Sequence, residues 1–244
     1  MQMLTSLLAA FNFLTILPLP AREVTPRDLG RAVGWFPLAG LGVGVALAGM
    51  DWLLGRWLPP GVTAALILAL WLMAHGAIHF DGFLDSCDGL FGGNTPDQRL
   101  TIMRDHRVGA FAVAGGVLLL LLKHNALTAL PSRATPLLLA PTLGRWAVAL
   151  AIVGFPYARE QGLGRAMKDH AGPAQALLAT ALALAATLLI GGWRGGIAMA
   201  AAGAGMALIA GFIQQRIPGL TGDSYGAIVE LSELIALLAL VIIH

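Results

Sequence analysis

The feature that most constrains this chain is a series of apolar runs, each about 20 residues long. A run of about 20 apolar residues can cross the hydrocarbon core of a bilayer as an α-helix. The composition agrees, because 57% of the residues are hydrophobic and only 11% are charged, whereas a soluble domain usually has about 25% charged residues. The sequence therefore predicts an all-α fold, a polytopic membrane helix bundle with about 7–8 transmembrane or membrane-embedded helices.

The apolar segments follow one another without a long polar linker, so we predict one integral-membrane domain covering residues 1–244. The first segment either spans the membrane or lies at its surface, because Asn12, Pro18 and Pro20 interrupt it. No Lys or Arg precedes it and no small-residue cleavage site is clear, so we expect no cleaved signal peptide. The predicted segments are 1–20, 32–54, 61–80, 109–130, 135–155, 174–192, 195–213 and 226–243.

Two local patterns bear on helix packing. Gly40 and Gly44 form a GxxxG motif, which allows two helices to approach closely in lipid. Pro141 falls inside segment 135–155, where a proline removes a backbone donor. We therefore expect a close helix contact at the first site and an interruption at the second.

The basic residues are distributed unevenly between the two sides of the membrane. If the loop around Arg22 and Arg31 is cytoplasmic, alternation of the segments puts ten Lys and Arg residues on that side and three on the other. The positive-inside rule supports this orientation. Twelve of the thirteen acidic residues also lie on or near that side, Asp51 being the exception. Topology explains the net charge of +2, so we predict no nucleic-acid partner.

One stretch, His75–Gly109, holds five of the thirteen acidic residues and is flanked by apolar segments. Carboxylates are costly near hydrocarbon, so this cluster indicates a functional site. Asp81, Asp85 and Asp88 are spaced i, i+4, i+7 and therefore share one face of a helix. Hard carboxylate oxygens suit Mg²⁺ or Mn²⁺ better than Zn²⁺. We predict a metal site on this face; the alternative is a solvated helix end.

Other residues of this stretch suit a phosphate group bound beside the metal. Gly82 and Gly89 leave room for a ligand near the carboxylates, so we predict that both bind substrate. Arg104, Asp105 and Arg107 follow as a charged group. A metal with arginines is the arrangement that neutralises a phosphate or diphosphate during transfer. We therefore predict catalytic roles for these three residues.

Polar residues in later segments are expected to complete the site. Arg159 and Lys168 are predicted to bind substrate from another cytoplasmic loop, although positive-inside anchoring explains each of them equally well. Asp223 is predicted to bind substrate, with helix capping as its alternative. Glu230 lies within an apolar segment, where an acid indicates function, and we predict a catalytic role for it.

The residues next to the aspartates are harder to assign. His75 and His79 are spaced i, i+4 ahead of the acidic cluster. We predict a catalytic role for His79 and keep three functions open: metal ligand, base, or hydrogen-bond donor. A structural role is the alternative for both histidines. Cys87 falls off the aspartate face, so no role is predicted; as the single cysteine it excludes an intramolecular disulfide.

Several motifs are recognisable as a set. Two long ones are HFDGFLDSCDGLFGG followed by IMRDHRVGAF, and GLTGDSYGAIVELSE near the C-terminus. Three shorter ones accompany them in order: FNFLTILPLP, WFPLAGLGVG and PYAREQGLG. This ordered set covers nearly the whole chain. It resembles the cobalamin-5′-phosphate synthase family, also called the adenosylcobinamide-GDP ribazoletransferases.

The resemblance implies a Mg²⁺-dependent transferase of the bacterial inner membrane, with its active site facing the cytoplasm. It implies adenosylcobinamide-GDP as one substrate and α-ribazole or its 5′-phosphate as the other. The products are then adenosylcobalamin or its 5′-phosphate, and GMP. Asp81, Asp85 and Asp88 hold Mg²⁺ on the diphosphate in this hypothesis. A carboxylate or His79 accepts the proton of the attacking hydroxyl.

Other partners and functions remain open at this point. Membrane lipid, a second copy of the chain and other cobalamin-assembly enzymes are expected partners. The acidic DG motif is also similar to that of CDP-alcohol phosphotransferases, but the chain lacks their Ala-Arg pair after DG and spaces its aspartates more tightly. A transporter would also combine intramembrane acids with broken helices. Here, however, the acids lie on one side and no inverted repeat is evident.

Overall fold

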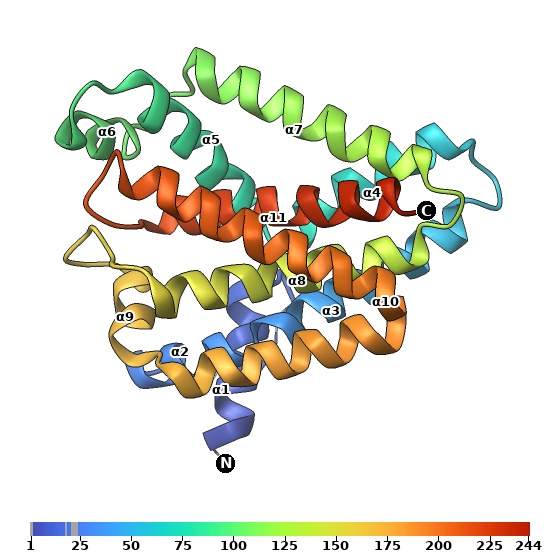
Figure 1. The fold of residues 1–244 in the computed structure, drawn as a ribbon, viewed down its shortest axis with the longest axis horizontal. Helices are drawn as coiled ribbons and strands as arrows, with labels where there is room; N and C mark the ends of the chain where they lie inside the picture. The colour runs from blue at the N-terminus through green and yellow to red at the C-terminus, as the bar shows by residue number, and fades with distance from the viewer. Residues whose placement is uncertain (1, 18, 21–23) are drawn as a thin grey trace.

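Helices account for almost all of the structure, a computed structural model that describes residues 2–17, 19–20 and 24–244 (Figure 1). Within these ranges there is no β-strand, only one isolated bridge between Tyr157 and Leu220. The predicted all-α class is therefore confirmed. Pro18 and Arg22 lie outside the described residues. The helices are α1 (Gln2–Leu14), α2 (Pro26–Ala32), η1 (Val33–Trp35), α3 (Phe36–Leu54), α4 (Pro60–Ala74), α5 (Ile78–Gly92), α6 (Pro96–Ile102), α7 (Ala110–Ala129), α8 (Ala134–Gly154), α9 (Leu163–His170), α10 (Pro173–Gln214) and α11 (Gly222–Ile242).

In the described part of the chain, five stretches of helix are long and apolar enough to cross a membrane, and the bent pair α4–α5 adds a sixth. The first stretch, Pro26–Leu54, joins α2, η1 and α3; the others are α7, α8, α10 and α11. Because so many long apolar helices occur in one chain, the protein is a multi-pass membrane protein. α1 is a shorter apolar helix of 13 residues.

The two ends of the bundle differ in their loops. α6, α9 and the start of α11 lie at one end, on the left of Figure 1. The α3–α4 loop, the α7–α8 loop and the bend of α10 lie at the other end. The first end carries Arg99, Arg104, Arg107, Arg159, Arg165, Lys168 and Arg216, whereas the second carries Arg56, Arg133 and Arg194. The bundle therefore has a basic end, and the acidic stretch belongs to it.

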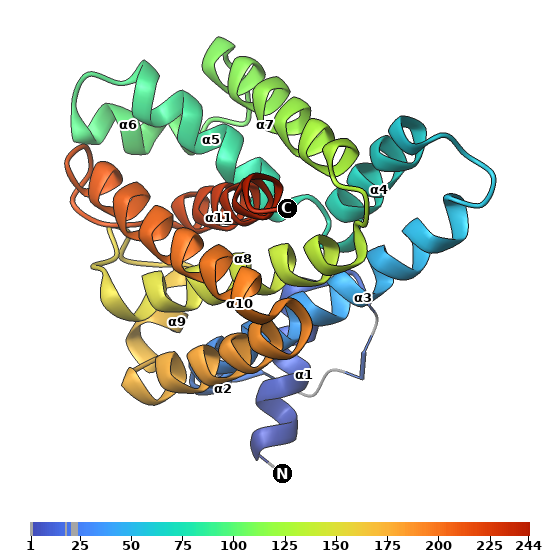
Figure 2. The ribbon, with the colours of Figure 1, turned by 45° about the vertical axis from the view of Figure 1, so that its right-hand side comes forward.

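The predicted segment 61–80 is not one helix. α4 ends at Ala74, α5 begins at Ile78, and the two are bent by 91° (Figure 2). Gly76 and Ala77 between them have φ values of 58° and 57°, a left-handed conformation that terminates a helix. The prediction of a continuous segment was wrong, because an apolar pattern does not reveal where the backbone leaves the helical conformation. The break gives the acidic stretch a helix of its own.

Segments 174–192 and 195–213 occupy the two arms of α10. The chain reverses direction between them at Gly192, whose φ of 55° and ψ of −140° are not helical (Figure 1). Glycine adopts such a conformation at little cost because it lacks a Cβ. The two predicted spans are therefore joined without an intervening polar loop.

The close contact expected at the GxxxG motif is made with α8. A Cβ at Gly40 would collide with the carbonyl oxygen of Pro141, and one at Gly44 would lie 2.7 Å from that of Leu137. α8 continues through Pro141 without a break, so the expected interruption was wrong. α3 packs closely against α8 at the position where the proline removes a hydrogen bond. α8 is consequently the most buried of the long helices, at the centre of the bundle (Figure 2).

Candidate active site

The three aspartates of α5 line one wall of a cavity of about 340 Å³ at the basic end of the bundle. α5 is helical throughout, so the i, i+4, i+7 spacing puts their side chains on one face. The α6–α7 loop, the α8–α9 loop and the start of α11 supply the rest of the lining. Its charged residues are Asp81, Asp85, Asp88, Arg104, Asp105, Arg107, Arg159 and Asp223. We call this space the polar cavity.

Asp88 is bonded differently from the other two aspartates. Its Oδ2 accepts a hydrogen bond from the backbone N–H of Gly109 at 2.6 Å, and its Oδ1 accepts one from Ala112 at 2.9 Å. These donors belong to the start of α7, where backbone N–H groups lack helical partners and a negative charge is favoured. Asp88 thus fixes α7 to α5. Asp81 and Asp85 accept no hydrogen bond from the part of the chain that the structure describes.

The α6–α7 loop places a paired and an unpaired cation at the cavity. Arg107 donates to Asp105 through Nη2 at 2.7 Å and through Nε at 3.0 Å. Hydrogen bonds from Arg107 lower the pKa of Asp105 to about 2, so this carboxylate is ionised at neutral pH. Arg104 lines the cavity without a partner among the described residues. Its guanidinium is therefore free to bind an anion.

Asp223 and Arg159 bring two distant segments to the cavity. Arg159 Nη2 donates to Asp223 Oδ2 at 2.6 Å, and each side chain is partly exposed. The α8–α9 loop contacts the α10–α11 loop, just before α11, through two backbone hydrogen bonds of 2.8 Å, from Ala158 to Leu220 and from Leu220 to Pro156. The predicted substrate-binding residues Arg159 and Asp223 are thus beside the aspartates of α5.

Gly82 allows α11 to approach α5. A Cβ at this position would lie 2.9 Å from the Cα and the carbonyl oxygen of Asp223. Because backbone atoms cannot move aside as a flexible side chain can, any larger residue would push the start of α11 away. Gly82 also lines a second cavity, described next, so it affects both packing and the space for a ligand.

A second cavity adjoins the polar one and shares Asp81, Arg159 and Asp223 with it. It also measures about 340 Å³, and we call it the apolar cavity. His79 lines this cavity rather than the polar one. Most of its other side chains are apolar or aromatic, among them Phe13, Phe36, Val148, Ile152, Tyr157 and Tyr225. The site therefore has a charged compartment and an apolar compartment that meet at three charged residues.

The chain is similar in sequence to known proteins of one family. The family model for cobalamin-5-phosphate synthase matches residues 6–241. The chain belongs to the cobalamin-5-phosphate synthase family. An adenosylcobinamide-GDP ribazoletransferase of Deinococcus radiodurans is 42% identical over 231 residues, which are 93% of this chain and 82% of that protein. A protein of the same name from Desulfitobacterium hafniense is 39% identical over 98% of this chain and 97% of the relative. Another, from Ectopseudomonas mendocina, is 42% identical over 95% of this chain and 96% of the relative. No solved structure matches the chain.

In this cobalamin-5-phosphate synthase family member, Glu230 lies outside the polar cavity. It is 1% exposed and pairs with Lys123 at 2.6 Å. Lys123 also pairs with Glu233 at 2.6 Å, and Glu233 pairs with Arg145. We call these four residues the buried ion network. The geometry does not support the predicted catalytic role of Glu230, because its charge is already compensated and it does not line either cavity.

Lys123, Arg145 and Glu233 were not among the predicted site residues. Each is an ionisable residue inside an apolar helix. Such residues are costly in a membrane unless they pair with one another. The presence of ionisable residues in apolar helices therefore indicates that they pair with one another. Their spacing in the sequence does not show which residues form the pairs.

Two other predicted substrate-binding residues make structural contacts. Gly89 packs against α6, where a Cβ would lie 2.9 Å from the carbonyl oxygen of Arg99. Lys168 donates to the carbonyl oxygen of Val153 at 2.9 Å. Burial lowers the pKa of Lys168, and the positive charge of the nearby Arg165 lowers it further. Neither residue lines the polar or the apolar cavity.

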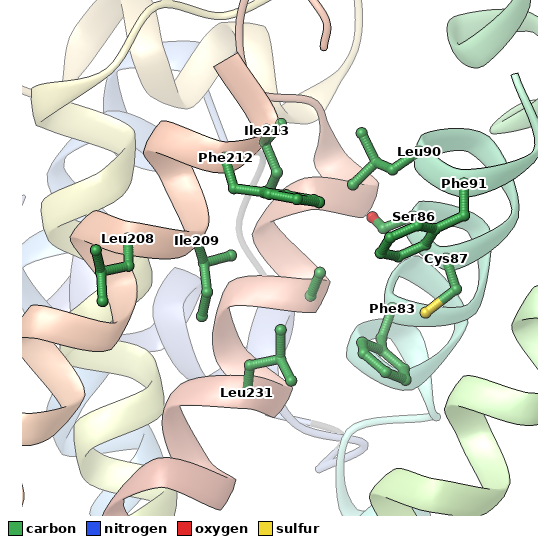
Figure 3. Close-up of a pocket in the computed structure, with 11 residues that line it drawn as sticks. Phe83, Ser86, Cys87, Leu90, Phe91, Leu208, Ile209, Phe212, Ile213 and Leu231 are labelled. Atoms are coloured by element: carbon green, nitrogen blue, oxygen red, sulfur yellow. The ribbon is translucent and has the colours of Figure 1, made fainter. Parts of the chain in front are cut away.

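The opposite face of α5 is apolar. Cys87 lines a third cavity, between α5, α10 and α11, together with Phe83, Phe91 and Phe212 (Figure 3). None of the residues lining this cavity is charged. α5 therefore separates a charged face from a face packed with aromatic side chains, and Cys87 points away from the aspartates as its position in the sequence indicated.

The carboxylate oxygens that line the polar cavity are the type of ligand that Mg²⁺ prefers. Among the described residues, no three His, Cys, Asp or Glu side chains already lie together as a group that could hold a metal ion. Mg²⁺ usually retains several waters and binds through one or two carboxylates plus substrate phosphates. Asp81 and Asp85 provide two such carboxylates without protein partners. Asp88, which caps α7, is the least available of the three predicted metal ligands.

Proposed function

We propose that this protein transfers the cobinamide-phosphate group of adenosylcobinamide-GDP to α-ribazole or its 5′-phosphate and releases GMP. The observation that carries the proposal is the polar cavity, where unpaired carboxylates lie opposite arginines. This cavity occurs in a chain that matches adenosylcobinamide-GDP ribazoletransferases over more than nine-tenths of its length. A diphosphate needs cations near its oxygens during transfer, and the cavity supplies them.

The proposed reaction forms one P–O bond and breaks another. The 3′-hydroxyl oxygen of the ribazole attacks the phosphorus joined to the cobinamide oxygen, and the bond from that phosphorus to the oxygen of GMP breaks. Negative charge on the phosphate oxygens is stabilised by Arg104, which has no protein partner, and by Arg107 at the rim. Positioning and electrostatic stabilisation supply most of the catalysis in such transfers.

The proton of the attacking hydroxyl needs a base between the two compartments. Asp223 lines both cavities. Its Oδ2 accepts from Arg159 at 2.6 Å, which leaves Oδ1 for the hydroxyl proton. A base must lie within hydrogen-bond reach of the proton that it removes. Asp223, at the start of α11, lies on the boundary of the two cavities and can therefore accept a proton from a hydroxyl group located there.

Magnesium is part of the proposal. Asp81 and Asp85 would hold the ion, because hard oxygen donors suit Mg²⁺ and these two carboxylates are unpaired. The ion would neutralise charge on the diphosphate. Arg104 and Arg107 act on the same charge from the opposite wall, so the chain contributes to substrate binding on both sides.

The transfer itself provides the test. Purified full-length protein is incubated with adenosylcobinamide-GDP, α-ribazole and Mg²⁺, and GMP and the corrinoid product are quantified by chromatography. We expect equimolar products, and loss of both on addition of a chelator. Asp97→Asn is the matched control for Asp85→Asn, because Asp97 belongs to the same acidic stretch but lies in α6 and does not line the polar cavity. Absence of GMP with the unmodified protein would overturn the proposal.

We also propose that the basic end faces the cytoplasm of a bacterial cell. Lys and Arg in short loops favour that side, and the substrates are charged, water-soluble molecules. Because Cys87 is the single cysteine and is buried, new cysteines can be labelled selectively. Gln98→Cys in α6 should react with an impermeant maleimide only after the cells are opened. Arg56→Cys in the α3–α4 loop should react in intact cells whose outer membrane has been permeabilised, and the reverse pattern would refute the orientation.

A further inference from the structure

The apolar cavity has the composition of a pocket for a flat aromatic group. Its volume of about 340 Å³ lies within the range of small-molecule pockets, about 300–1,000 Å³. Two aromatic pairs contribute to its walls. The Phe13 and Phe36 rings are stacked with centroids 6.1 Å apart, and the Tyr157 and Tyr225 rings are stacked with centroids 5.7 Å apart. Aromatic rings favour offset-stacked or edge-to-face contact with another ring.

Among the polar residues that line this cavity, His79 has its hydrogen-bonding state fixed by a neighbour. Its Nδ1 lies 3.3 Å from Nη2 of Arg145. A guanidinium can only donate hydrogen bonds, so Nδ1 must be the acceptor and the imidazole is neutral with its proton on Nε2. Nε2 has no partner in the described part of the chain, and His79 lines the apolar cavity. The residue therefore offers a ligand an N–H donor, and of the three roles left open by the sequence this geometry selects the donor.

We propose that the apolar cavity is the subsite for the heteroaromatic base of the acceptor nucleoside, with His79 Nε2–H donating to the base's unsubstituted ring nitrogen. This inference rests on the proposed function, which makes a benzimidazole riboside the acceptor. A dimethylbenzimidazole joined to ribose through one nitrogen keeps a single acceptor, its other ring nitrogen, and is otherwise apolar. The cavity supplies a matching donor, His79 Nε2, among walls that are mainly apolar and aromatic; its other polar lining residues are Tyr157, Tyr225, Gln161 and the three charged residues shared with the polar cavity.

The alternative occupants fit less well. Guanine carries several donors and acceptors along its edge, and burying them without partners in an apolar pocket is unfavourable. A corrin ring with its amide side chains is too large for the cavity. The nucleoside base is therefore the part of the two substrates whose chemistry agrees with the lining.

The shared boundary of the two cavities sets the orientation of the acceptor. With the base in the apolar cavity, the ribose lies at Asp81, Arg159 and Asp223, the three residues common to both. Its hydroxyl then points toward the polar cavity, where the diphosphate binds. The two substrates approach the reacting phosphorus from different compartments, so each can bind without the other.

Binding by the full-length protein in detergent tests this separation. α-Ribazole and GDP are titrated by calorimetry, singly and together, and we expect each to bind with the other present at saturation. His79→Leu should raise the Kd of α-ribazole about 5- to 100-fold, as expected when a buried hydrogen bond is lost, and leave the Kd of GDP unchanged. His75→Phe is the matched control. The His75 ring is tilted against the His79 ring with centroids 4.8 Å apart but does not line the cavity, so both affinities should be unchanged.

A ligand analogue tests the hydrogen bond without altering the protein. In a dimethylindole riboside, the free ring nitrogen is replaced by C–H. The unmodified protein should bind it about 5- to 100-fold more weakly than α-ribazole, whereas His79→Leu should bind the two nucleosides equally. Leu163→Ala provides a second variant, since Leu163 is 58% exposed and lines the cavity. Its Kd for α-ribazole should rise about 3- to 10-fold because apolar contact is removed.

Two outcomes would overturn the inference. One is displacement of α-ribazole by GDP, which would put both in a single pocket; the other is equal binding of the two nucleosides by the unmodified protein. Neither would refute the transfer reaction, which is measured separately by GMP release. Conversely, α-ribazole binding with the expected selectivity but without GMP release would refute the proposed function and retain the pocket.

Discussion

The polar cavity and the buried ion network use the same kinds of residue for opposite purposes. In the network, two cations and two anions are at most 3% exposed, and each acid has a basic partner. In the polar cavity the acids outnumber the arginines, and Asp81 and Asp85 have no partner among the described residues. Complete pairing indicates a structural role, because an unpaired buried charge is strongly unfavourable. Incomplete pairing at an accessible surface indicates that a ligand supplies the missing charge.

Lys123→Met gives the largest expected effect on stability. The substitution leaves Glu230 and Glu233 buried with only Arg145 to compensate them, and removing one partner of a buried pair typically costs about 3–5 kcal/mol. We expect a much lower yield and a large fall in the thermal unfolding temperature in detergent. Adding Glu230→Gln should recover part of the loss, since it removes one of the uncompensated charges. Equal stability of the single variant and the unmodified protein would show that the network is not structural.

Asp85→Asn gives the largest expected effect on activity. In the proposed mechanism Asp85 would hold Mg²⁺ and orient the diphosphate, and its loss should then lower kcat on the order of 10²–10³-fold, by comparison with other electrostatic groups. The unfolding temperature should stay the same or rise, because a repulsive charge is removed beside Asp81 and Asp88. Measuring kcat and unfolding on the same preparation separates the two regions. If this variant unfolded as readily as Lys123→Met, the comparison would fail.

Gly82→Ala should affect both properties moderately. The new methyl group would meet the backbone of Asp223 at about 2.9 Å, and overpacking of this kind costs about 1–3 kcal/mol. Displacement of α11 should also raise the KM for the acceptor. Gly49→Ala in α3 is the control, because nothing lies within 4 Å of a Cβ there. Unchanged KM in Gly82→Ala would indicate that α11 does not position the site.

The smallest effect is expected from the Asp105–Arg107 pair at the rim. Hydrogen bonds from Arg107 lower the pKa of Asp105 from 3.8 to about 2. The stabilisation is therefore fully present above the unfolded pKa and is lost only as the pH falls toward 2. Between about pH 5 and 8 the carboxylate stays ionised, so Asp105→Asn should not change the shape of the pH–activity profile there. A new inflection in that range would contradict this assignment.

The local parts of this site could be predicted from the sequence. The spacing of Asp81, Asp85 and Asp88 placed them on one helical face, and the Gly40–Gly44 motif indicated a close helix contact, because both depend on residues a few positions apart. The break at Gly76–Ala77 could not be read in this way. Its two left-handed residues include an alanine, whose presence alone does not indicate a turn.

The sequence by itself determined that this chain forms membrane helices, that one helix carries an acidic face, and which family the motifs resemble. Only the tertiary structure decided which charges are paired. Glu230 and Asp223 are seven residues apart on α11, yet one is sealed against Lys123, 107 positions away, and the other faces two cavities. Whether a carboxylate binds a ligand or supports the fold depends on neighbours brought by distant helices. Composition, spacing and helical periodicity do not contain that information.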